Sequence, residues 1–191
     1  MAMTDAPNVV DAKILAAMTH PLRRRLLDVL RVDGPSTVSK LADRTSEAVG
    51  NVSHHVRVLA AANLVEQVPE LSRDRRDRWW RLAAPRLRWS ADDVAHDSAA
   101  RAVATAAESL NLDRQVGLVR DWLGAPDQQR AKWAHGAFST DSWLRLTPDE
   151  LAELGAQLTT LLGQWAGRTS PDDGQDREPV FVFLRGVPGQ P

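Results

Sequence analysis

The chain of 191 residues has no cysteine, and only three of its 24 basic residues are lysine. The absence of cysteine excludes disulfides, thiolate metal sites, thiol redox sensing and cysteine nucleophiles. No basic start is followed by a long apolar run, and no segment reaches the length of a membrane span. The sequence therefore predicts a cytoplasmic protein without a signal peptide or a membrane partner.

Catalytic signatures are also absent. The sequence contains no G-x-G-x-x-G, Walker loop, G-x-S-x-G or H-E-x-x-H pattern, so it predicts neither an enzyme nor a cofactor. One acidic cluster contains a histidine, but a single histidine makes a poor transition-metal site, and carboxylates after Ser90 are explained by capping of a helix. We therefore predict no metal site at these residues: Asp92, Asp93, His96 and Asp97.

Charge differs between the two halves of the chain. Residues 1–90 carry 15 Lys and Arg against 10 Asp and Glu, a net charge of +5, whereas residues 91–191 carry 9 against 15, a net charge of −6. A cationic half beside an acidic half favours a nucleic-acid-binding domain joined to a part with another role.

Apolar residues recur at helical spacing in four N-terminal segments, which predict helices beginning near Val10, Pro21, Thr37 and Val49. The second helix opens with three arginines at 23–25, interpreted as a solvated face or as phosphate contacts. The last two helices are joined by a short turn, the order of a helix-turn-helix. The fourth spans 49–62, and its predicted core stripe is Val49, Val52, Val56 and Leu59.

The opposite side of the fourth helix is polar and centres on His54. Side chains of this kind on the first turns of an outward helix read base edges or bind phosphates. For His55, on the flank, a structural hydrogen bond and a phosphate contact stay equally open. The candidates for DNA contact on the third and fourth helices are Thr37, Ser39, Lys40, Asn51, Ser53, His54, His55 and Arg57.

Residues 64–69 and 77–83 are predicted to form two antiparallel strands. The hairpin between them, a wing at 69–78, is rich in arginine, and a cationic hairpin beside a recognition helix can reach the DNA backbone or an adjacent minor groove. The wing candidates for DNA contact are Arg73, Arg75, Arg76 and Arg78.

Several short motifs resemble the ArsR-type winged-helix transcriptional regulators over residues 10–90. They are His-Pro-Leu-Arg at 20–23, Leu-Ala at 41–42, Val-Ser-His-His-Val-Arg-Val-Leu at 52–59, Asn-Leu-Val at 63–65 and Trp-Arg-Leu at 80–82. The resemblance implies a homodimer that binds a near-palindromic operator, usually as a repressor. Two features depart from the family pattern: Asn63 replaces a frequent glycine, although it tolerates the same left-handed cap, and the family's metal ligands are missing.

Residues 92–123 are Ala-rich and predict a long helix that Asn111 or Gly117 can break or bend. One face of this helix is predicted to be lined by Ala95, Ala99, Ala102, Val103, Ala106 and Leu110. At this position the family has its dimerisation helix. Beyond it, a capping box at 147–150 predicts a helix, flanked by strands around 142–146 and 180–184. The appendage is either structural or lines a pocket for an unidentified small-molecule effector.

These observations predict a mainly α (α+β) protein with a winged helix-turn-helix domain at 9–90, a dimerisation helix at 91–124 and a strand–helix–strand region at 125–191. The predicted function is a sequence-specific, double-stranded-DNA-binding transcriptional regulator, a homodimeric repressor with helix 49–62 in the major groove and wing 69–78 on the flanking backbone. The alternative is a winged-helix module that binds a protein instead of DNA; exposed apolar residues on the fourth helix would favour it.

Overall fold

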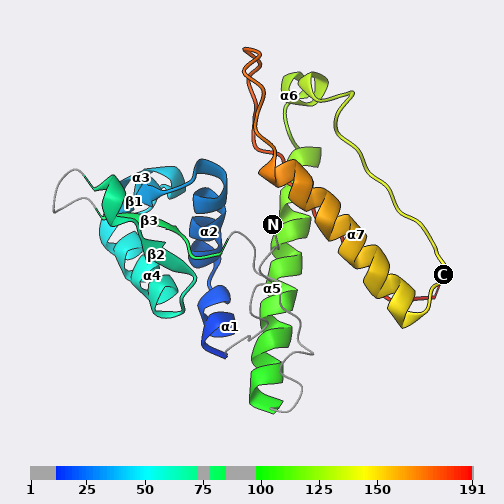
Figure 1. The fold of residues 1–191 in the computed structure, drawn as a ribbon, viewed down its shortest axis with the longest axis horizontal. Helices are drawn as coiled ribbons and strands as arrows, with labels where there is room; N and C mark the ends of the chain where they lie inside the picture. The colour runs from blue at the N-terminus through cyan, green and yellow to red at the C-terminus, as the bar shows by residue number, and fades with distance from the viewer. Residues whose placement is uncertain (1–11, 73–77, 85–97, 191) are drawn as a thin grey trace. The chain divides into compact units, whose positions relative to one another are not determined.

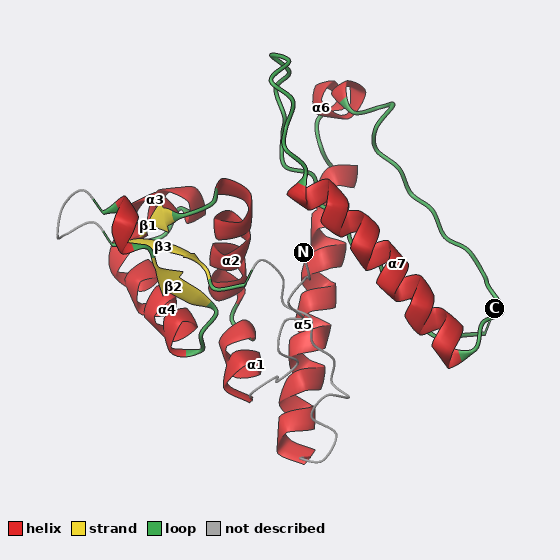
Figure 2. Ribbon diagram, in the orientation of Figure 1, coloured by secondary structure: helices red, strands yellow, loops and turns green. Residues whose placement is uncertain are grey.

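The computed structural model describes residues 12–72, 78–84 and 98–190. The chain divides into two compact units, Met1–Val116 and Gly117–Pro191, and the division falls within one long helix. Figure 1 labels the elements of both units, and Figure 2 distinguishes helices from strands. Among the described residues, no helix combines the length and the apolar character needed to cross a bilayer.

The first unit contains a winged helix-turn-helix fold, as the sequence predicts. Strand β3 lies between β1 and β2 in an antiparallel sheet, and α3 and α4 pack on α2. The two-residue strand β1 and the short 3-10 helix η1 were not predicted. The elements are α1 (Ala12–Met18), α2 (Pro21–Asp33), β1 (Ser36–Thr37), α3 (Val38–Thr45), α4 (Val49–Ala61), β2 (Val65–Gln67), η1 (Pro69–Leu71) and β3 (Trp79–Leu82).

Local signals set the helix ends. The side chain of His20 accepts the backbone N–H of Leu22 at the start of α2, and Pro21 occupies the first turn. Thr37 caps α3 by accepting the N–H of Lys40. Asn63, after α4, has a φ of 54°, which confirms the left-handed conformation predicted for the residue in place of glycine.

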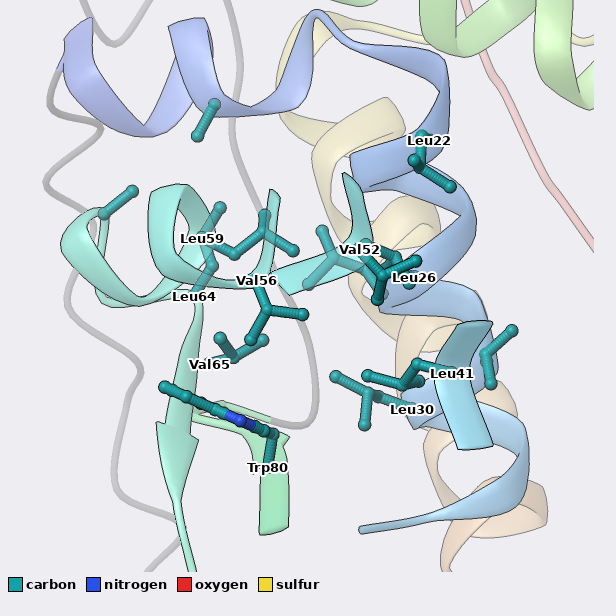
Figure 3. Packing of buried hydrophobic residues seen from close by; sticks show 14 of the residues in the cluster. Leu22, Leu26, Leu30, Leu41, Val52, Val56, Leu59, Leu64, Val65 and Trp80 are labelled. Atoms are coloured by element: carbon teal, nitrogen blue, oxygen red, sulfur yellow. The ribbon is translucent and has the colours of Figure 1, made fainter. Parts of the chain in front are cut away.

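The core of this unit joins the inward faces of α2, α3 and α4 to one face of the sheet (Figure 3). Leu26, Leu41, Val52 and Leu59 are completely buried, and Trp80 of β3 packs beneath them. The prediction for Val49 is wrong, because this residue is 52% exposed. It is the first residue of α4, one turn before the buried stripe begins at Val52, and so lies outside the core.

Helix α5 (Ser98–Leu123) continues through Asn111 and Gly117 without a break. Its predicted apolar face is wrong: Ala104 and Ala107 are completely buried, whereas Ala102 is exposed. An Ala-rich helix with small residues on every side has no distinctly apolar stripe, so the sequence does not indicate which side packs. The predicted start of this helix at residue 92 lies outside the described residues.

The second unit contains α6 (Asp127–Lys132), which was not predicted, and α7 (Pro148–Gly167). The predicted capping box of α7 is confirmed, since Thr147 and Glu150 each accept the other's backbone N–H. The two flanking strands are wrong for this chain, because 142–146 and 180–184 have no regular secondary structure. Both have strand-like sequences, but no described residue pairs with them as a strand.

Candidate nucleic-acid interface

Helices α3 and α4 form the two arms of the helix-turn-helix, joined by a tight turn at residues 46–48. Ser46 ends α3 in the left-handed region, at a φ of 55°, which turns the chain sharply before α4 begins. Burial of Val52, Val56 and Leu59 fixes the rotation of α4 about its axis. The opposite side of the helix is therefore held toward solvent.

The outward side of α4 is polar and partly organised by its own hydrogen bonds. His54, Asn51 and Arg57 are exposed. The Asn51 amide Nδ2 donates to Glu47 Oε2 at 3.0 Å, and Arg57 Nη2 donates to Ser53 Oγ at 3.2 Å. These bonds restrain the side chains while leaving further donors and acceptors for a ligand.

Glu47 was not among the predicted site residues. It lies in the turn before α4, which begins at Val49, so helical spacing does not relate Glu47 to Asn51 and the sequence contained no signal for this contact.

Of the candidates for DNA contact at α3, some side chains already interact within the protein and one is simply exposed. Thr37 caps the helix, so its hydroxyl oxygen already accepts the N–H of Lys40. Ser39 is exposed. The Lys40 ammonium lies 4.6 Å from the ring centroid of Trp79 on β3, a cation–π contact that holds it beside the sheet.

The wing begins where β2 and β3 diverge. Gln67 pairs with Trp80, and the Trp79 carbonyl accepts the Val68 N–H at 2.9 Å. Arg78 lies just before β3 and is exposed. Arg81 forms an ion pair with Glu66, with its Nε 2.7 Å from the carboxylate Oε1. The other wing candidates, Arg73, Arg75 and Arg76, lie outside the described residues.

His55 is placed differently from its neighbours on α4. It is 7% exposed, and its ring centroid lies 4.2 Å from that of His20. Burial lowers the pKa of His55, and the nearby His20, Arg23 and His54 lower it further, against an opposite effect of Glu47. Its Nδ1 is buried with no hydrogen-bond partner in the described part of the chain. His55 therefore lies inside the domain, away from the outward side of α4.

The arginine run on α2 is largely engaged within the protein. Arg23 donates to the backbone carbonyls of Ala16 and Ala17, and Arg24 Nε donates to the backbone carbonyl of Met18 at 3.2 Å. Arg24 Nη1 also donates to Asn111 on α5 at 2.7 Å. Burial, followed by the charge of Arg114, lowers the pKa of Arg24 to about 10.

These contacts join the end of α1 and α5 to α2. They favour a structural role for Arg23 and Arg24, and Arg25 is the exposed member of the run.

No group of three or more His, Asp or Glu side chains in the described ranges is arranged to hold a metal ion. The acidic cluster that contains His96 falls within residues 85–97, outside those ranges.

Comparison with known proteins assigns a class to part of the chain. A family model described as a helix-turn-helix domain matches residues 18–68, and no curated protein matches the chain. Residues 18–68 run from the end of α1 to the end of β2, so the match contains both arms of the motif described above. The first unit thus carries a helix-turn-helix domain, with the sheet as its wing.

Three solved structures are similar over part of the chain. A possible transcriptional regulatory protein from Mycobacterium bovis (fragment 1–100) is 21% identical, with 58% of this chain and 89% of that one covered and a TM-score of 0.35. A possible transcriptional regulator for arsenical resistance is 30% identical, with 57% of this chain and 96% of that one covered and a TM-score of 0.32. An apo mutant of ZitR from Lactococcus lactis is 17% identical, with 78% of this chain and 86% of that one covered and a TM-score of 0.35.

The superpositions over the whole chain are weak, and the description of the fold rests on the helices and the sheet themselves. Helix-turn-helix domains bind DNA through the second helix of the motif. The domain match and the winged fold together support a DNA-binding regulator.

Proposed function

We propose that this protein is a homodimeric, sequence-specific DNA-binding transcriptional regulator of the ArsR type that acts as a repressor, with α4 in the major groove. The observation that carries the proposal is the two-sided character of α4. Its Val52, Val56 and Leu59 side is buried, which holds Asn51 and His54 outward on the first turns. In helix-turn-helix proteins, the residues near the start of the second helix contact base edges.

The proposed contacts follow from these exposures. Asn51 and His54 contact base edges, and the Glu47 carboxylate, which accepts a hydrogen bond from the Asn51 amide, orients that amide. Arg57, Ser39 and Lys40 contact phosphates, and the wing arginines bind the flanking backbone. His55 and Thr37 are engaged inside the domain and support the interface without reaching DNA.

The resemblance to ArsR-type regulators supports the homodimer and the repressor role. Two copies of α4, related by a twofold axis, would enter successive major grooves about 34–36 Å apart on one side of the duplex.

Binding to the duplex upstream of the protein's own gene, measured by fluorescence anisotropy, tests the proposal. We expect Asn51→Ala and His54→Ala to reduce discrimination between the bound site and a scrambled site by about 1–3 kcal/mol for each base contact. A matched control replaces Gln128 and His135, exposed residues of the same chemistry in the second unit, with alanine. Unchanged site preference in the Asn51/His54 double variant contradicts the assignment of α4 as the recognition helix.

Arg78→Ala tests the wing separately. A phosphate contact contributes about 0.9 to the slope of log K against log salt concentration, so the variant should flatten that slope by about one and weaken binding to all sequences alike. If no duplex binds even at low salt, the DNA-binding proposal is wrong, and the protein-binding alternative replaces it.

A further inference from the structure

The outward side of α4 has one large apolar side chain. Val49, the first residue of the helix, is 52% exposed, and the other exposed residues of the first two turns are Gly50, Asn51 and His54. A single exposed valine is common on protein surfaces. The position of Val49 is what matters, because it lies on the helix that the proposed function places in the major groove.

Helical spacing places Val49 in line with Arg57 and beside His54, both of which the proposed function assigns to DNA. Residues four apart lie one above the other on a helix, so Val49, Ser53 and Arg57 form one row, and Gly50 and His54 form the next. The hydrogen bond from Arg57 to Ser53, at 3.2 Å, runs along the first row. Both rows lie away from the buried stripe of α4 (Figure 3).

Gly50 leaves the helix surface beside Val49 without a side chain. A Cβ added at Gly50 would have no neighbour within 4 Å among the described residues, and the φ of Gly50 is not positive. Packing and backbone conformation would therefore both accept alanine, which is the better helix former. The physical consequence of glycine here is that another molecule can approach the helix backbone closely.

An apolar side chain in this position fits one group in the major groove. Base pairs present hydrogen-bond donors and acceptors there, and the one apolar group among them is the C5-methyl of thymine. Contact between Val49 and that methyl group removes apolar surface of both partners from water. Any other base edge would place Val49 against polar groups with which it forms no hydrogen bond.

A protein partner fits these residues less well than DNA does. A standard protein interface buries about 800 Å² of each partner around an apolar centre, whereas Val49 is surrounded by Asn51, His54 and Arg57, which are exposed and polar. Val58 packs against the core and does not extend the apolar surface. One valine among polar side chains matches one methyl group among polar base edges.

We propose that Val49 is a specificity-determining residue that contacts the C5-methyl group of a thymine in the bound site, and that Gly50 lets α4 come close enough for this contact. The inference rests on the proposed DNA binding and adds the identity of one base to it.

Deoxyuridine lacks only the methyl group of thymine, so it tests the contact without changing the protein. Each thymine of the bound duplex is replaced in turn, and affinity is measured by fluorescence anisotropy. We expect at least one replacement to weaken binding of the unaltered protein about fourfold, the effect of losing one buried methyl group. Val49→Ala should bind this duplex and the original one about equally. Val32→Ala, a matched control near the end of α2 with the same 52% exposure, should keep the fourfold difference.

Three outcomes contradict the inference. If the protein binds a specific duplex and no deoxyuridine replacement weakens binding, the inference is wrong and the DNA-binding proposal stands. The same conclusion follows if the loss caused by deoxyuridine is as large in Val49→Ala as in the unaltered protein. If no duplex binds even at low salt, the proposed function and the inference are both wrong.

Gly50→Ala tests the close approach of the helix. Alanine should raise the urea midpoint of unfolding, because it is the better helix former. It should also weaken specific binding at least about tenfold, because its methyl group lies between the helix and the base edges. Gly155→Ala, in α7, where an added Cβ also has no described neighbour within 4 Å, should leave DNA binding unchanged. If Gly50→Ala binds the specific duplex as tightly as the unaltered protein, α4 does not approach DNA in the proposed way.

Discussion

The winged helix-turn-helix part and the second unit contain helices of similar quality but differ in packing. Leu59 of α4 is completely buried, whereas Leu161 of α7 is 50% exposed. The start of α7 is nevertheless the better capped of the two, with a complete capping box at Thr147 against no side-chain cap at Ala48 before α4. Local signals thus define a helix without providing it with a core, and a core needs residues brought from elsewhere.

The largest effect that tests this comparison comes from shortening one leucine in each part, Leu59 in the winged part and Leu161 in the second unit. Leu59→Ala should lower the free energy of unfolding by about 2–5 kcal/mol, because the buried side chain leaves a cavity. Leu161→Ala should cost about 0.5 kcal/mol or less in a single chain, as a change at an exposed surface does. Urea denaturation of both variants, at a concentration where the chain is monomeric, measures the difference. Equal losses would contradict the contrast between the two parts.

At higher protein concentration, the same two variants test whether α7 takes part in dimerisation. If α7 lies in the contact of the proposed homodimer, the effect of Leu161→Ala should increase with protein concentration, whereas that of Leu59→Ala should not. An effect of Leu161→Ala that stays constant while the mass doubles would place the dimer contact elsewhere.

We expect acid to lower the free energy of unfolding by a smaller amount, through His55 in the winged part. Because burial and neighbouring His20, Arg23 and His54 lower the pKa of His55, the folded state binds this proton less tightly than the unfolded state, whose pKa is about 6.5. The contribution of neutral His55 to the free energy of unfolding is therefore complete above about pH 6.5. It is lost as the pH falls through the folded-state pKa of His55. Urea denaturation across this range measures the loss.

His55→Phe should remove this part of the pH dependence, because phenylalanine fills the same site without titrating. His135→Phe, at an exposed histidine of the second unit, provides the matched control and should keep it. An unaltered pH profile in His55→Phe would show that another group is responsible.

The third prediction concerns the cap that makes α7 a helix. Thr147→Ala removes the hydroxyl that accepts the Glu150 N–H, and loss of such a cap costs about 0.5–2 kcal/mol of helix stability. We expect faster amide exchange in the first turn of α7. Thr160→Ala, an exposed change in the interior of the same helix, should slightly slow exchange because alanine is the better helix former. The same rate in both variants would argue against the cap.

The sequence predicted the parts of the fold that local chemistry determines. Helical spacing located α2, α3 and α4, and Asn63 was placed correctly in the left-handed region. Val49 was misplaced because periodicity alone does not reveal where a helix leaves its core. The inward side of α5 was misjudged because alanines surround the helix. The strand-like segments at 142–146 and 180–184 have the right composition, but a strand requires a partner that a single sequence does not specify.

In the candidate site too, the features set by local sequence were predicted and those that depend on distant residues were not. Solvent-facing positions of α4 followed from its core stripe, so Asn51 and His54 were placed outward correctly. The buried contact of His55 with His20 joins residues 35 positions apart and had no local signal. Assignment of the outward residues to DNA contact stays a prediction.

The smallest effect tests how Lys40 is held beside the sheet. A cation over an aromatic ring at an exposed site contributes about 0.5–1 kcal/mol, so Lys40→Gln should lower stability by roughly that amount, with a shift in tryptophan emission from Trp79. Lys40→Arg should keep both values, since a guanidinium also stacks on aromatic rings. If Lys40→Gln weakens DNA binding at unchanged stability, the ammonium leaves Trp79 for a phosphate in the complex. If it lowers stability without affecting binding, Lys40 fixes α3 to β3 and is not a DNA contact.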